Sequence, residues 1–234
     1  EMGEHPDLTE EVTSWVTEVA KIPVWAKMTP NITNIREPAL AAVAGGAVGI
    51  SAINTILSVI GVDLDTLDPA QQTTTTVQNV IDYGLQTLVA FDTQGKIKPL
   101  LATSWETSKD GLTLTLQLRQ GVKFHDGTPF NAEAAAFSLD RLISGKVKVP
   151  IGAGFKSIKS IEAVNPTTLA IHLKQPDPNL LPNLSITTAS IFSQASATKD
   201  GNTPTNIVRP VGTGPYQFTR WNKGSEVVYT RVDD

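Results

Sequence analysis

Val62-Asp-Leu-Asp-Thr-Leu-Asp-Pro-Ala70 marks the place where the sequence pattern of this 234-residue chain changes. Before it, short apolar runs alternate with amphipathic segments, which is typical of parallel β-α-β units. After it, alternating strands are joined by tight turns, which is typical of a mixed sheet built from hairpins. We therefore predict two domains, at 1–67 and 68–234, joined near Leu67-Asp-Pro-Ala70.

Composition excludes several classes of function. The net charge is −4 and no run of Lys or Arg is present, which argues against a nucleic-acid partner. The chain has no cysteine, which excludes disulfides, thiolate metal sites and cysteine nucleophiles. Its histidines, His5, His125 and His172, lie far apart and lack ligand spacing, so we predict no metal site. The weakly apolar run 39–60 is broken by glycines and polar residues and is a poor membrane span.

The first domain is predicted to alternate helices and strands. Apolar residues recur at helical spacing after Asp7, which is a suitable N-cap. Two short apolar runs suit buried parallel strands. The expected order is a helix over 8–20, a strand over 21–27, a helix over 35–44 and a strand over 48–53.

Three side chains follow these predicted strands and are candidate site residues. Lys27 ends the first strand, and Asn54 and Thr55 follow the second. In (β/α)₈ barrels the C-terminal ends of the strands face the active site. From spacing alone the alternative stays open that Lys27 is a solvated strand-end lysine and that Asn54-Thr55 is a turn.

The stretches Lys21-Ile-Pro-Val-Trp-Ala-Lys27 and Ala44-Gly-Gly-Ala-Val-Gly-Ile-Ser-Ala-Ile-Asn-Thr55 resemble the FMN barrel of dihydropyrimidine and dihydroorotate dehydrogenases. The resemblance implies that Lys27 contacts FMN, and that Asn54 and Thr55 hydrogen-bond a pyrimidine which a flavin hydride reduces. The loop with the proton-donating cysteine and the later strands of that barrel are expected to be missing. A fragment with so few strands cannot close a barrel, so a competent flavin site is not expected.

The second domain is predicted as a mixed sheet with covering helices. Leu112-Thr-Leu-Thr-Leu-Gln-Leu118 alternates strictly and follows Asp110-Gly111, a hairpin signal. Asn131 is a good N-cap for a helix that ends before Gly145. The other expected elements are a strand over 104–108, a helix over 77–88, a hairpin over 158–163 and 168–173, a short helix over 179–184, a strand that starts at 212, and a strand over 225–232.

No catalytic constellation is predicted in this second domain. His125 lies in a turn beside Phe124, where a packing or backbone-bonding role is the commoner one. Asp126 is followed by glycine, which is typical of a turn. The stretch Gly212-Thr-Gly-Pro-Tyr216 lacks the lysine of a P-loop and leads into a strand, so it is not a phosphate site.

The stretches Pro99-Leu-Leu-Ala-Thr-Ser-Trp-Glu106, Lys123-Phe-His-Asp-Gly-Thr-Pro-Phe130 and Val211-Gly-Thr-Gly-Pro-Tyr216 resemble family-5 solute-binding proteins. The resemblance implies an α/β, two-lobed periplasmic-binding-protein fold, of which this chain carries part of the first lobe. It also implies a receptor without a cofactor that delivers peptides or similar small solutes to ABC importer permeases. Such a protein is periplasmic or extracytoplasmic and meets the membrane only through its transporter.

Position within that lobe gives four candidate ligand-binding residues. The loop after Leu67-Asp-Pro69 and the segment 187–190 are expected to border the cleft, which selects Gln72, Thr73, Thr188 and Ser190. The chain is thus interpreted as a chimera of two families, and as a receptor with no catalytic residues. The alternative function is FMN-dependent pyrimidine reduction, which would be cytoplasmic.

Overall fold

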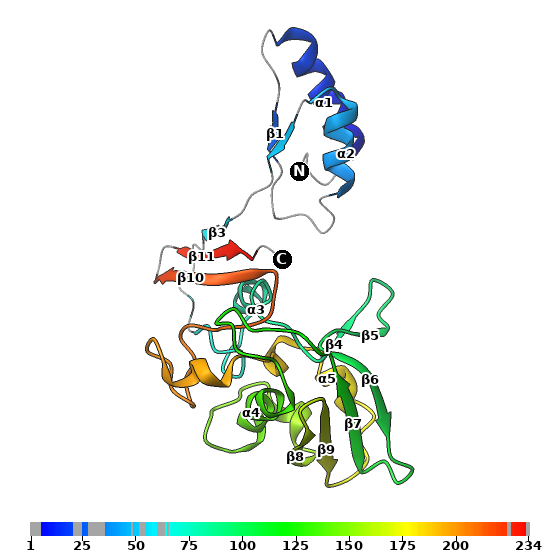
Figure 1. The fold of residues 1–234 in the computed structure, drawn as a ribbon, viewed down its shortest axis with the longest axis vertical. Coiled ribbons are helices and arrows are strands. Elements are labelled where there is room, and N and C mark those ends of the chain that lie inside the picture. The colour runs from blue at the N-terminus through cyan, green and yellow to red at the C-terminus, as the bar shows by residue number, and fades with distance from the viewer. Residues whose placement is uncertain are drawn as a thin grey trace. The chain divides into compact units, whose positions relative to one another are not determined.

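The computed structural model describes residues 6–20, 25–27, 36–47, 49–51, 55–59, 64, 66–223 and 226–232. The chain divides into two compact units, Glu1–Ile56 and Leu57–Asp234, whose elements are drawn in Figure 1. This division describes packing and not ancestry, so the domain boundary at 67/68 stays a prediction.

The first unit contains two helices and two short parallel strands. Trp25 of the first strand lies opposite Gly49 of the second, and Lys27 lies opposite Ser51. The assignment of these elements to a barrel stays a prediction. Their order is α1 (Pro6–Val19), β1 (Trp25–Lys27), α2 (Arg36–Ala44) and β2 (Gly49–Ser51).

Helices α1 and α2 contact one another where α2 ends. The hydroxyl of Thr17 donates a hydrogen bond of 2.8 Å to the carbonyl oxygen of Gly45. A Cβ at Gly45 would lie 2.6 Å from the carbonyl oxygen of Glu10, so only glycine permits this approach. The outer face of the pair stays exposed, with Trp15 at 57% and Val19 at 79% of their full accessibility.

The second unit is built on a four-stranded antiparallel sheet in the order β6-β7-β9-β8. Both hairpins that the sequence predicts are present in it. Leu114, Leu116 and Leu118 are buried on one face, as their alternation predicts. The strands are β6 (Ala102–Thr107), β7 (Thr113–Leu118), β8 (Ile158–Asn165) and β9 (Thr168–Leu173).

Helix α4 (Ala132–Ile143) packs against β8 and β9. The predicted cap is confirmed, because the side chain of Asn131 accepts a hydrogen bond of 2.9 Å from the backbone N–H of Ala134. Gly145 follows the helix with a φ of 70°, a conformation that glycine adopts without strain. Leu139 and other apolar side chains of α4 lie in the core with the leucines of β7.

Helix α3 (Thr75–Ile81) is shorter than predicted, and the prediction that it extends to residue 88 is wrong. A distant segment of the chain takes the place of the next helical turn. The N–H of Gly214 donates to the carbonyl oxygen of Gly84 at 3.0 Å. A Cβ at Gly212 would lie 2.0 Å from that same oxygen. This contact also explains why the strand predicted to start at 212 begins only at Tyr216.

A second sheet has the order β10-β11-β3, and β4 and β5 form a separate hairpin. Residues 57–59 of β3 belong to the second unit, so that unit begins before the change of pattern in the sequence. The strands are β3 (Thr55–Val59), β4 (Val89–Phe91), β5 (Ile97–Pro99), β10 (Tyr216–Asn222) and β11 (Glu226–Arg231). The short helices are η2 (Gly152–Phe155), α5 (Leu180–Asn183), η3 (Thr187–Ala189) and η4 (Gln194–Thr198).

Candidate functional site

A buried ion pair between Asp68 and Arg141 holds the loop that precedes the candidate site. Asp68 is 0% exposed and Arg141 is 5% exposed. Both terminal nitrogens of the guanidinium donate to the carboxylate, one of them at 3.0 Å. The backbone N–H groups of Ala70 and Ile207 also donate to it, at 3.0 and 2.9 Å. The carboxylate therefore has a donor on each oxygen, which a buried charge requires.

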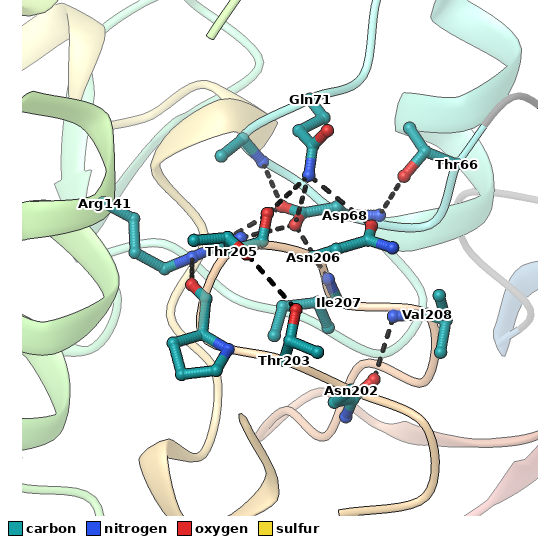
Figure 2. Close-up of polar contacts among 12 residues, drawn as sticks. Thr66, Asp68, Gln71, Arg141, Asn202, Thr203, Thr205, Asn206, Ile207 and Val208 are labelled. Carbon is teal, nitrogen blue, oxygen red and sulfur yellow. Dashed lines mark hydrogen bonds and ion pairs between the residues drawn. The ribbon is translucent and has the colours of Figure 1, made fainter. Parts of the chain in front are cut away.

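Figure 2 shows that this network joins three segments that are far apart in sequence. Arg141, on α4, donates through Nε to the carbonyl oxygen of Pro204 at 2.8 Å and lies 5.1 Å from the ring centre of Phe192. Gln71 donates to Asp68 at 3.1 Å and to the carbonyl oxygen of Thr205 at 2.9 Å. The network thus fixes the backbone on which the next residue, Gln72, is presented.

Two of the four predicted ligand-binding residues lie in direct contact. Gln72 is 1% exposed and Thr188 is 3% exposed. The amide nitrogen of Gln72 donates a hydrogen bond of 2.9 Å to the hydroxyl of Thr188, across 116 residues of sequence. Ser190 is also buried, whereas Thr73 is exposed. Contact with a ligand by any of the four stays a prediction.

A second pair of residues extends this contact along α3, and the sequence analysis missed it. Gln78 donates to the side-chain oxygen of Gln72 at 3.2 Å. The hydroxyl of Thr187 donates to Asp82 at 2.8 Å. Gln78 and Asp82 are four residues apart on the polar side of the predicted helix, which is the one signal that could have identified them. We call Gln72, Gln78, Asp82, Thr187 and Thr188, with Ser190, the polar cluster.

Burial favours the protonated forms of two acidic side chains at the polar cluster, Asp82 and Tyr229. Burial raises the pKa of Asp82, and the hydrogen bond from Thr187 acts in the opposite direction. Burial also raises the pKa of Tyr229 on β11, and the charge of Asp82 adds to that effect. Tyr229 is therefore a neutral phenol at physiological pH.

Two buried hydroxyls in this part of the second unit have no partner. They are the Oγ of Ser190 and the OH of Tyr229. An unsatisfied buried hydroxyl is costly, and buried polar groups are normally paired with protein, water or a ligand. The hydroxyl of Ser190 is thus the one buried side-chain group of the polar cluster that has no hydrogen-bond partner among the described residues.

His125 has the backbone-bonding role that the sequence predicts. Its Nε2 lies 2.8 Å from the carbonyl oxygen of Gly214. Burial lowers the pKa of His125, which the bond to Gly214 and the nearby Asp126 only partly oppose. The carboxylate of Asp126 accepts hydrogen bonds from Ser193 and Thr128 at 2.6 and 2.5 Å. These residues hold a turn and form no nucleophile–base pair.

Two of the three predicted flavin and pyrimidine contacts lie at strand ends within the described residues. Lys27 is the last residue of β1, and Thr55 is the first residue of β3. Asn54 lies outside the described residues. Their roles toward FMN stay predictions, because no side-chain geometry of the three is described.

Neither a cluster of metal ligands nor a membrane-spanning helix is found within the described ranges. Among those residues no group of three or more His, Asp or Glu side chains could hold a metal ion. None of the helices described there is both long and apolar enough to cross a bilayer.

The two parts of the chain match different families of known proteins. Residues 96–234, more than half of the chain, match the family model of bacterial extracellular solute-binding proteins, family 5. Residues 1–99 match the model of dihydroorotate dehydrogenase. Two different families thus match successive stretches, which supports a chimeric chain.

Curated proteins with similar sequences also support the match to solute-binding proteins. The glutathione-binding protein GsiB of Escherichia coli O6:K15:H31 is 37% identical over 172 residues, which are 74% of this chain and 33% of GsiB. The chain thus spans about a third of the length of the curated relatives it matches.

Solved structures agree as well. AgaA from A. tumefaciens R10, in complex with agropinic acid, has a TM-score of 0.66 at 32% identity, over 72% of this chain and 34% of AgaA. The periplasmic binding protein DppA from Helicobacter pylori, in complex with the peptide STSA, has a TM-score of 0.65 at 32% identity, over 74% of this chain and 38% of DppA. The mixed α/β architecture is therefore part of a periplasmic-binding-protein fold. The chain belongs to family 5 of the bacterial extracellular solute-binding proteins.

Proposed function

We propose that the second unit acts as part of the substrate-binding component of an ABC importer for peptides or similar small solutes. The observation that carries this proposal is the family match over 96–234. Its relatives include a glutathione-binding protein and a periplasmic binding protein in complex with a peptide. The partners are then the permease subunits, the location is periplasmic or extracytoplasmic, and no reaction is catalysed.

The polar cluster is proposed to border the solute cleft of this unit, beneath the exposed loop residue Thr73. Receptors of this fold close two lobes on a ligand, so each lobe presents polar groups to the cleft. The amides of Gln72 and Gln78 and the free hydroxyl of Ser190 suit a peptide, whose backbone both donates and accepts hydrogen bonds. Thr73, exposed on the same loop, is proposed as a further contact.

Nuclear magnetic resonance can test this function on the chain as it exists. Titration with glutathione and with a dipeptide should shift the backbone amide signals of 72–74 and 187–190. The signals of Gly95 and Asp110, in turns outside the cluster, serve as internal controls. The expected affinity is weak, because most of the relatives' length is not covered by this chain. Shifts confined to other surfaces would reject the proposal.

We also propose that residues 1–67 derive from an FMN-dependent dihydropyrimidine dehydrogenase, fused to a receptor lobe at 68–234. The match of 1–99 to dihydroorotate dehydrogenase and the parallel pair β1–β2 around α2 support this ancestry. Under this alternative Lys27, Asn54 and Thr55 would bind FMN and uracil or thymine. The purified protein would then be yellow and absorb between about 350 and 500 nm, as bound flavin does. If the protein is colourless and shows no flavin absorbance after incubation with FMN and removal of the unbound flavin, only the proposed ancestry would remain.

A further inference from the structure

We propose that a lysine-rimmed pocket in the second unit binds a small organic anion with an apolar body. The pocket has a volume of about 670 Å³, which lies in the range of sites for drug-sized ligands. It is formed by the end of α4, the loop that follows, η2, and residues at the ends of β8 and β9. No residue of the polar cluster lines it, so this proposal does not depend on the function proposed above.

The floor of the pocket is apolar. Phe155 and Ile158 are almost fully buried, at 1% and 2% exposure, and Leu142 and Val147 each reach 8%. Val149 and Pro150 of the loop complete the wall. The floor residues are covered by their neighbours, so the accessible carbon surface comes mainly from Val149, Pro150 and Ala153. A ligand with an apolar body gains from contact with these residues.

The rim carries positive charge without a balancing carboxylate. Lys156, Lys159 and Lys174 line the pocket and are exposed, and no Asp or Glu is among the lining residues. Lys174 donates through Nζ to the carbonyl oxygen of Lys156 at 3.0 Å, which orients one ammonium group over the pocket edge. Three like charges gathered on a chain of net charge −4 repel one another, and a bound anion relieves that repulsion.

Floor and rim together specify the ligand class. The expected occupant carries a carboxylate or sulfonate head, which accepts charge-assisted hydrogen bonds from the lysines. Its aromatic or aliphatic body fills the apolar depth. A neutral apolar molecule would contact the apolar residues but form no ion pair with the lysines. A polyanion without apolar surface would pair with the lysines but leave the apolar residues uncovered.

A matched pair of fluorescent probes tests this assignment. 8-Anilinonaphthalene-1-sulfonate carries the anionic head, and N-phenyl-1-naphthylamine has the same aromatic body without it. The full chain should bind the sulfonate saturably at one site, and its affinity should exceed that for the neutral probe by about tenfold or more. Rising salt should reduce this difference, because the rim is exposed to solvent.

Substitutions of pocket residues test whether the probes bind in this pocket. The combined changes Lys156→Gln, Lys159→Gln and Lys174→Gln should weaken sulfonate binding by about tenfold and leave the neutral probe unaffected. The same positions changed to Arg should restore affinity. The matched control changes Lys96, Lys98 and Lys109, all exposed and outside the pocket, to Gln. Ala153→Trp should reduce binding of both probes by filling the pocket, and circular dichroism checks that each variant is folded.

Two results with the fluorescent probes would overturn the proposal. One is equal affinity of the wild type and the triple Gln variant for the sulfonate probe. The other is binding at many sites that Ala153→Trp does not reduce. Preferential binding of an acidic peptide in place of the sulfonate would identify a protein partner, and would also reject a small-molecule site.

Discussion

The two compact units place their large apolar side chains differently. In the first unit Trp15, Val19 and Leu40 are 57%, 79% and 55% exposed. In the second unit Leu116 and Phe192 are 0% exposed. A helix gains stability mainly by burying its apolar face against another layer. The described helices of the first unit leave large apolar side chains exposed, whereas the second unit buries such side chains in a core of its own.

Removal of the buried arginine tests the second unit most severely. Arg141→Ala leaves the carboxylate of Asp68 buried without its ion pair. The free energy of unfolding should fall by about 3–5 kcal/mol, measured by chemical denaturation. Asp68→Asn with Arg141→Met removes both charges and should recover part of that loss. A loss below about 1 kcal/mol for Arg141→Ala would show that solvent reaches the pair.

Two glycines allow a matched comparison between the units. Gly212→Ala places a methyl group 2.0 Å from the carbonyl oxygen of Gly84, and Gly45→Ala places one 2.6 Å from that of Glu10. We expect Gly212→Ala to lower the free energy of unfolding of the second unit by about 1–3 kcal/mol. Gly45→Ala should leave the unfolding transition of the second unit unchanged, because this substitution affects only the contact between α1 and α2. Equal loss for both would show that the units unfold as one.

Acidification should weaken the second unit through His125 by a smaller amount. Burial lowers the pKa of this imidazole, so the unfolded chain takes up the proton first as the pH falls below about 6.5. The contribution of His125 is complete above that pH and is lost as the pH falls toward its folded pKa. His125→Gln should flatten the decline in stability between about pH 7 and 5, measured by urea denaturation. His172→Gln, at a partly exposed position on β9, controls for loss of one imidazole. An unchanged slope in His125→Gln would contradict the assignment.

The smallest effect is expected on the exposed face of the first unit. Val19→Ala and Trp15→Ser remove side chains that are mostly in solvent, so each should change stability by less than about 0.5 kcal/mol. Leu116→Ala, in the core of the second unit, is the matched comparison and should cost about 2–5 kcal/mol. A large loss of stability in Val19→Ala, measured by thermal unfolding, would show that Val19 is covered by other residues. The contrast between the two units would then disappear.

Elements whose signals are local could be predicted from the sequence. The alternation of Leu114, Leu116 and Leu118 specified β7, the side chain of Asn131 specified the start of α4, and both hairpins followed from their turn residues. Helical spacing could not set the end of α3, because Gly84 is engaged by Gly214, 130 positions later.

The pairing of buried polar side chains depends on how distant segments pack, and it could not be predicted from the sequence. Gln72 and Thr188 were selected by position along the chain, yet their hydrogen bond spans 116 residues and depends on how the loop after Pro69 is held. Arg141 holds that loop through Asp68, and nothing in the local sequence of either residue indicates the pairing. Periodicity and capping act over a few residues and can be read from the chain, whereas buried polar contacts form only after distant segments have packed together.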